Sequence, residues 1–135
     1  MDANTVLSAL LSRSKSFEVF VINRRLKRFE FIAPEFMFTE LLKHFDEILK
    51  RSGLEREELE RVLEFVKEQI EFIPLEKFSA YREEAERLAP HPKDVQYFAL
   101  ALAFGSAIWS KEKAFGDQQK VKVYSTPEML ELLKQ

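Results

Sequence analysis

Four acidic side chains stand where carboxylates could do chemistry. Asp2 precedes the first apolar helix, and Glu40 lies in the second turn of a helix that follows a predicted strand at 29–32. Asp94 opens an apolar helix, and Glu112 follows a short apolar strand. In open α/β sheets, functional sites gather outside the carboxyl ends of the strands. Four carboxylates that converge there would repel one another unless a divalent cation held them, and ligation by oxygen alone suits Mg²⁺ or Mn²⁺. Such a metal can activate a water molecule and stabilise the charge that develops in phosphodiester cleavage.

The same carboxylates also have an ordinary interpretation as solvated surface. The chain has 23 acidic residues among 135, so some of them will lie near one another without any function. Most charged side chains in a folded protein are exposed. Spacing alone therefore leaves both a metal site and an acidic surface open.

Composition excludes most other catalytic mechanisms. The chain has no cysteine, two histidines and three glycines. It contains no nucleophile elbow, Walker loop, glycine-rich dinucleotide turn or histidine-rich zinc motif. The net charge of −2 argues against indiscriminate binding of nucleic acid over the whole surface, but leaves a local basic patch open. No apolar run approaches the roughly 20 residues of a membrane span. We expect a cytoplasmic protein that does not enter a membrane.

Strands alternate with helices or helix pairs along the whole chain. This order predicts one α/β domain over residues 1–135, with a mainly parallel sheet covered by helices on both faces. The predicted strands are 29–32, 70–73, 107–109 and 121–124. The predicted helices are a short one capped by Asn4 or Thr5, then 17–26, 34–50, 55–69, 79–88 with Ser79 as its cap, 95–104, and a last one from Thr126.

The segment 91–115 is the centre of this arrangement. Its helix at 95–104 is apolar at every position except Gln96, and a helix that is apolar all round belongs inside a domain. Gly105 supplies the expected helix end. Asp94 and Glu112 thus flank the most buried part of the predicted fold.

A basic segment closes the predicted helix 17–26. Within residues 1–28, six basic residues outnumber two acidic ones, although the chain as a whole is weakly acidic. Cations at the carboxyl end of a helix complement its dipole, whereas the same cations could also contact phosphate groups. Composition favours the first interpretation and leaves RNA contact open for Arg24, Arg25, Lys27 and Arg28.

Four segments in order resemble the acidic motifs of PIN-domain proteins. Residues 1–11, MDANTVLSALL, resemble the first motif, an Asp followed two residues on by Asn or Ser and then an apolar helix. Residues 33–42, APEFMFTELL, resemble the second motif, a Glu-Leu on the helix after the second strand. Residues 92–103, PKDVQYFALALA, resemble the third. Residues 108–115, IWSKEKAF, resemble the fourth, in which Thr or Ser is usually followed two residues on by Asp and then by another Asp. The ending 121–128 also fits, so the likeness covers the whole chain.

This resemblance implies a three-layer PIN-like fold with a metal-dependent nuclease site. Asp2, Glu40, Asp94 and Glu112 would bind Mg²⁺ or Mn²⁺, or orient the water that attacks phosphorus without a covalent enzyme intermediate. Asn4 and Ser110 would hydrogen-bond these carboxylates and hold them in place.

The resemblance also implies partners. PIN-domain nucleases commonly act on RNA, and many are the toxin of a toxin–antitoxin pair, so RNA and an antitoxin protein are the expected partners. The alternative is a catalytically weak or inactive PIN domain that serves as an RNA-binding or protein-interaction module. A plain globular interaction protein is the third possibility, and would require the order of the motifs to be a coincidence.

Two features depart from the family pattern. Glu112 stands where Asp is usual, and Ala114 stands where a further acid is common; Asp117 is near enough in sequence to substitute, without support from a motif. In the family, an apolar strand in the centre of the sheet runs into the first Asp, whereas only Met1 precedes Asp2 here. A missing central strand leaves backbone groups of its neighbours unpaired, each costing about 1–3 kcal/mol if buried. We therefore expect an upstream apolar strand in the complete domain. Without that strand, the chain would re-pair its sheet, form a homodimer through the exposed strand edges, or adopt a loosened fold.

Overall fold

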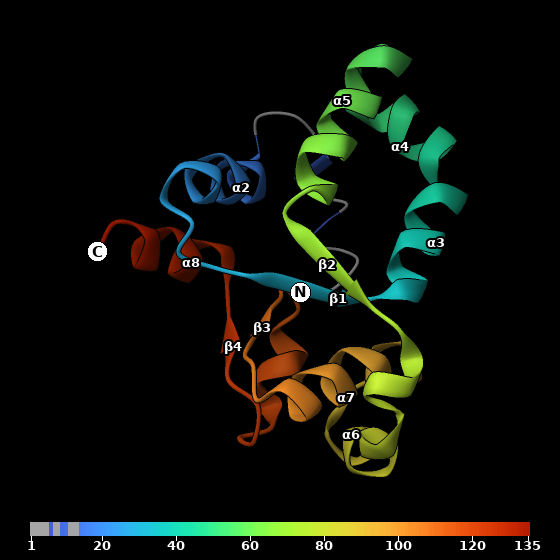
Figure 1. The fold of residues 1–135 in the computed structure, drawn as a ribbon, viewed down its shortest axis with the longest axis vertical. Coiled ribbons are helices and arrows are strands. Elements are labelled where there is room, and N and C mark those ends of the chain that lie inside the picture. The colour runs from blue at the N-terminus through green and yellow to red at the C-terminus, as the bar shows by residue number, and fades with distance from the viewer. Residues whose placement is uncertain (1–5, 7–8, 11–13) are drawn as a thin grey trace.

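The computed structural model describes residues 6, 9, 10 and 14–135 (Figure 1). Its strands are β1 Phe31–Pro34, β2 Ile70–Ile73, β3 Ile108–Trp109 and β4 Val123–Tyr124. Its helices are α2 Lys15–Leu26, α3 Glu35–Lys43, α4 Phe45–Ser52, α5 Arg56–Lys67, α6 Arg82–Leu88, α7 Val95–Phe104 and α8 Thr126–Leu133. Short 3₁₀ turns cover Leu75–Lys77, Ser79–Tyr81, Pro92–Asp94 and Lys113–Asp117. The helix predicted to begin at Asn4 or Thr5 falls mostly outside the described residues.

The strands form two parallel pairs. β1 pairs with β2, so that Phe31 lies opposite Ile70, and β3 pairs with β4, so that Ile108 lies opposite Val123. The expected α/β fold with parallel strands is confirmed. The expectation of one sheet is wrong for the strands that the structure describes, because these form two separate two-stranded sheets.

Helices lie on both sides of the β1–β2 pair. In Figure 1, α3, α4 and α5 lie on one side of this pair, and α6 and α7 lie on the other. α3 contacts both strands, α5 contacts β2, and α7 contacts β1. α8 packs on α2, where the hydroxyls of Ser16 and Thr126 form a buried hydrogen bond of 3.3 Å.

Three buried aromatic rings join the two strand pairs. The ring of Phe20 on α2 lies with its centroid 5.0 Å from that of Phe31 and 5.4 Å from that of Trp109. The Phe31 and Trp109 centroids are 5.6 Å apart. The first residue of β1 and the last residue of β3 therefore meet on one side chain of α2, and the core continues from one pair to the other.

The strand predicted at 29–32 begins two residues later than expected. The cause is Asn23, a buried side chain on α2. Its Oδ1 accepts a hydrogen bond from the Phe29 N–H at 2.9 Å, and its Nδ2 donates to the Phe29 carbonyl at 3.1 Å. Because a side chain already satisfies both backbone groups of Phe29, the strand ladder starts at Phe31.

The single helix predicted at 34–50 is wrong, because the chain breaks at His44. His44 has φ −99° and ψ 11°, outside helical geometry. The break separates α3 from α4, which contacts both α3 and α5. Ser79 is also not the cap of α6; it lies in a 3₁₀ turn that leads into the helix at Arg82.

The helix predicted at 95–104 is confirmed as α7. Gly105 ends it in the left-handed conformation, with φ 62°, as expected. Burial is complete only in the middle of the helix, from Tyr97 to Ala101, whereas Phe104 is exposed. None of the described helices has the length and apolar character needed to cross a membrane.

Candidate active site

Glu40 lies on α3, which follows β1 without a loop. Pro34 ends the strand and occupies the position before the first helical residue, so the strand directly fixes the direction of α3. The Glu40 carboxylate is partly exposed and lies 3.5 Å from Nε2 of His44. Nδ1 of the same ring lies 3.5 Å from the carboxylate of Glu47. The sequence shows these three residues at helical spacing, but sequence reasoning assigned no role to His44.

Asp94 lies at the amino end of α7. It is the last residue of the 3₁₀ turn Pro92–Asp94, where its N–H donates to the His91 carbonyl at 2.9 Å. The side chain is half-buried and makes no capping hydrogen bond to the helix that it opens. Asp94 therefore does not serve as an ordinary helix cap.

One aromatic contact joins the helices that carry these two carboxylates. The rings of Phe36 on α3 and Tyr97 on α7 lie with centroids 5.5 Å apart. Phe36 is one helical turn before Glu40, and Tyr97 is nearly one turn after Asp94. This contact is a point at which the two helices meet, within about one turn of each acid.

Ser110 shapes the turn that carries Glu112. Its N–H donates to the Tyr124 carbonyl at 3.0 Å, which extends the β3–β4 pairing by one residue. Its buried hydroxyl accepts a hydrogen bond from the Glu112 N–H at 3.0 Å. Glu112 itself is exposed, as are Ala114 and Asp117 in the 3₁₀ turn that follows. Ser110 thus fixes the backbone conformation of the predicted fourth motif. The hydrogen bond from Ser110 to a carboxylate, which the family resemblance implies, stays a prediction.

The described residues contain no group of three or more His, Asp or Glu side chains arranged to hold a metal ion. Asp2 and Asn4, the acid and amide of the first motif, lie outside the described residues. The four-carboxylate site therefore stays a prediction. The predicted ligand atoms are all carboxylate oxygens, which are the ligands that a hard divalent cation such as Mg²⁺ prefers.

The four basic residues near the end of α2 are all exposed. Arg24 forms an ion pair of 3.2 Å with Glu68, and Arg28 donates to the Leu132 carbonyl at 3.4 Å. Arg24 and Arg25 lie in the last turn of α2, and Lys27 ends the helix in the left-handed conformation, with φ 52°. These positions support the helix-end interpretation, and RNA contact by these four residues stays a prediction.

A comparison with known families agrees with the motifs. The family model for the PIN domain matches residues 1–133. No curated protein and no solved structure matches the chain. A PIN domain is a nuclease-type fold, and PIN domains generally use divalent metal ions. Because the match covers almost the whole length, the chain belongs to the PIN-domain family.

Proposed function

We propose that this chain is a metal-dependent endoribonuclease that hydrolyses RNA phosphodiester bonds. The observation that carries the proposal is the contact between the rings of Phe36 and Tyr97, which lie on the two helices that bear Glu40 and Asp94. Each of these two carboxylates stands at the position of a PIN acidic motif. The match to the PIN family over residues 1–133 supports the same conclusion.

Each residue of the proposed site has a distinct task. Asp2, Glu40, Asp94 and Glu112 would hold Mg²⁺ or Mn²⁺. When bound, the ion would supply an activated water and would stabilise charge on the phosphate. His44 would orient the Glu40 carboxylate, and Ser110 would fix the turn that presents Glu112. Asn4, two residues after Asp2 in the first motif, would donate a hydrogen bond to these carboxylates.

A cleavage assay tests the proposal directly. The purified chain is incubated with a mixture of unstructured and hairpin RNAs in Mn²⁺, in Mg²⁺ and in EDTA. We expect cleavage with either metal, none in EDTA, and none from the Glu40→Gln and Asp94→Asn variants. Cleavage that persists in EDTA, or that both variants retain, would remove the carboxylates from the mechanism.

The second candidate is a weak or inactive PIN domain that acts as an RNA-binding or protein-interaction module. One observation favours it: Ala114 stands where a further acid is common. This candidate predicts RNA binding that is unchanged by EDTA, together with no cleavage in either metal. The same assay, combined with a binding measurement, separates the two.

We also propose RNA and an antitoxin protein as partners of the nuclease, in the role of the toxin of a toxin–antitoxin pair. This proposal rests on the PIN family alone. Induced expression of the chain in a bacterial host should arrest growth, whereas equal expression of the Glu40→Gln variant should not. Equal growth with both chains would count against the toxin role.

A further inference from the structure

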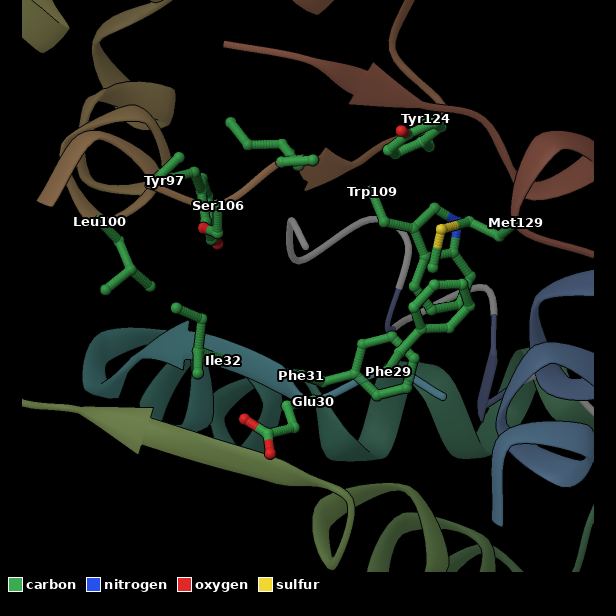
Figure 2. Close-up of a pocket in the computed structure, with 13 residues that line it drawn as sticks. Phe29, Glu30, Phe31, Ile32, Tyr97, Leu100, Ser106, Trp109, Tyr124 and Met129 are labelled. Atoms are coloured by element: carbon green, nitrogen blue, oxygen red, sulfur yellow. The ribbon is translucent and has the colours of Figure 1, made fainter. Parts of the chain in front are cut away.

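Two hollows border α7. The first, of about 180 Å³, lies between the two strand pairs, where Ile32, Leu100 and Trp109 are among the residues that line it (Figure 2). The domain's own central first strand is expected at this place. The second hollow, of about 590 Å³, lies between α7, α6 and the turns that follow β2. We refer to this second space as the α6–α7 pocket.

The α6–α7 pocket has the size and the lining of a small-molecule site. Pockets for small ligands commonly measure about 300–1,000 Å³ and combine apolar walls with a few polar groups. The apolar part of the wall includes Phe78, Pro92 and Val95. A ligand here would rest on apolar surfaces and meet polar groups at its edges. The polar side chains of the wall are those of Ser79, Arg82, Glu86, His91 and Gln96.

The charges in the wall of the pocket balance each other. Arg82 and Glu86 are the only Arg, Lys, Asp or Glu residues that line it in the described structure. They form an ion pair along α6, in which Nε of Arg82 donates to Oε1 of Glu86 at 2.9 Å. A balanced pair gives no excess positive charge to attract a phosphate. The pocket therefore suits an uncharged ligand, and a nucleobase is an uncharged ring with apolar faces and polar edges.

Two polar side chains of the pocket fit the recognition of a base. The His91 ring is exposed, and its Nδ1 accepts a hydrogen bond from the Lys93 N–H at 3.2 Å, so the neutral ring carries its proton on Nε2. The Gln96 amide is half-buried and makes no hydrogen bond to another described residue. Unpaired RNA bases are commonly recognised by stacking on His or Arg and by hydrogen bonds to their edges. His91 and Gln96 supply both kinds of contact.

The pocket lies directly beside Asp94 in the chain. The Asp94 N–H donates to the His91 carbonyl at 2.9 Å, and Val95, the next residue, lines the pocket. Asp94 itself is not among the lining residues, so the pocket adjoins the proposed metal site and is separate from it. An RNA strand with one phosphate at Asp94 would bring the base of a neighbouring nucleotide to this pocket.

We propose that the α6–α7 pocket binds one unpaired base of single-stranded RNA, from a nucleotide next to the scissile phosphate. The His91 ring stacks on the base, and the Gln96 amide hydrogen-bonds to its edge. The place of the base beside the cleaved bond rests on the proposed nuclease function, whereas the binding of a base in the pocket does not depend on cleavage.

RNA binding in EDTA tests the pocket without cleavage. The probe is a short fluorescein-labelled oligoadenylate, and its matched control is the same ribose-phosphate chain without bases. Both carry the same charge, so contacts to phosphate contribute equally to the two affinities. We expect the oligoadenylate to bind at least about tenfold more tightly, the effect of one stacked base. Equal affinity of the two chains would overturn the proposal.

Protein variants test the position of the base. His91→Ala and Gln96→Ala should each reduce the preference for the oligoadenylate about threefold or more, with no change for the chain without bases. Tyr81→Ala and Gln119→Ala are the matched controls, because both residues are exposed and neither lines the pocket. Equal losses in the controls would place the base elsewhere and overturn the proposal. His91 is exposed, so its variant decides the question even if Gln96→Ala impairs folding.

Cleavage in Mn²⁺ tests the place of the base relative to the cleaved bond. A single nucleotide without a base is moved along an RNA substrate, and KM and kcat are measured at each position. We expect a rise in KM of about tenfold at one position next to the cleaved bond, and no such rise in the His91→Ala variant. Normal cleavage with the same KM at every position would overturn the pocket proposal and leave the nuclease intact. Base-dependent binding without cleavage of any RNA would overturn the nuclease function and leave the pocket as the base site of an RNA-binding module.

Discussion

Nε2 of His44 lies 3.5 Å from the carboxylate of Glu40, so the residue that ends α3 contacts the acid of the second PIN motif. The contact joins residues four apart on the helix and is solvated on both sides, with side-chain exposures of 44% and 41%. Such pairs contribute only about 0.2–1 kcal/mol to stability. The His44–Glu40 contact therefore matters for geometry more than for stability, because it restricts the directions in which the Glu40 carboxylate can point.

Replacing Glu40 by Gln should reduce metal-dependent RNA cleavage by about 100-fold or more, because the amide keeps the shape of the side chain but removes an anionic ligand. The control is Glu47→Gln. Glu47 contacts the other nitrogen of the same His44 ring, also at 3.5 Å, but belongs to no motif. Cleavage rates are compared at saturating Mn²⁺, with melting temperatures for both variants. Equal losses in the two variants would indicate a general effect on α3 and not a catalytic ligand.

Replacing Asp94 by Asn should abolish cleavage while leaving the fold intact. The Asp94 side chain makes no capping hydrogen bond to α7, so the substitution removes no cap there. The readouts are Mn²⁺-dependent cleavage and the circular dichroism spectrum. Asp46→Asn serves as the control, because Asp46 pairs with Arg56 on the surface and lies outside the motifs. Unchanged activity in the Asp94 variant would exclude Asp94 from the reaction.

Much of the fold follows from the sequence because local rules agree with tertiary packing there. The short apolar segment Ile70–Ile73 points to a strand and the apolar run Val95–Phe104 points to a helix, and both predictions are confirmed. The errors have tertiary causes. Asn23 takes over both backbone groups of Phe29 from 6 residues away, and no strand propensity contains that information. The break at His44 has no glycine or proline beside it to mark it in the sequence.

The candidate site is only partly predictable for a related reason. Motif order identifies Glu40 and Asp94, and the Phe36–Tyr97 contact joins their helices. The separation of the strands into two pairs depends on the partners available to β1 and β3, which the spacing of residues along the chain does not encode. The role of Ser110 in shaping the Glu112 turn also needed the structure, because its hydroxyl bonds to a backbone group two residues away.

Replacing Ala114 by Asp should raise the cleavage rate or lower the Mn²⁺ concentration required for half-maximal rate. This position carries a further acid in many PIN domains, and Ala114 is exposed, so the substitution should change stability by no more than about 0.5 kcal/mol. The control is Ala80→Asp, an exposed alanine in the turn before α6. If the Ala114 variant still binds RNA but does not cleave it, the non-catalytic module is favoured.

Replacing Asn23 by Ala should destabilise the fold by about 1–3 kcal/mol, since the backbone groups of Phe29 lose partners in a part-buried position. The Gln69 amide, whose Oε1 accepts from Asn23 at 3.4 Å, also loses a donor. Urea unfolding measures the change, and Gln119→Ala, at an exposed residue, is the control. A loss below about 0.5 kcal/mol would mean that water replaces the side chain at Phe29.

The start of α8 should make stability depend on pH in acid. The Ser125 N–H donates to the Glu128 carboxylate at 2.9 Å, and the Ser125 hydroxyl accepts from the Glu128 N–H at 3.3 Å. The hydrogen bond from the Ser125 backbone, followed by the side-chain hydrogen bond of Ser125 and the charge of Lys122, lowers the pKa of Glu128 below its usual value of 4.5. Because the pKa is lower in the folded chain, the folded state favours the ionised carboxylate. The stabilisation is complete above the unfolded pKa and is lost as the pH falls through the folded pKa.

The Glu128→Gln variant makes this dependence measurable. Its melting temperature should lie below that of the wild type at pH 7, and the difference should narrow as the pH falls below about 4.5, the usual pKa of the carboxyl group. Glu131→Gln, an exposed acid near the carboxyl end of the same helix, controls for the general loss of one negative charge. Melting curves for the three chains between pH 3 and pH 7, a range that spans about the usual carboxyl pKa values, are sufficient. A difference for Glu128→Gln that stays constant down to the lowest pH would show that the capping carboxylate acts through its shape and not its charge.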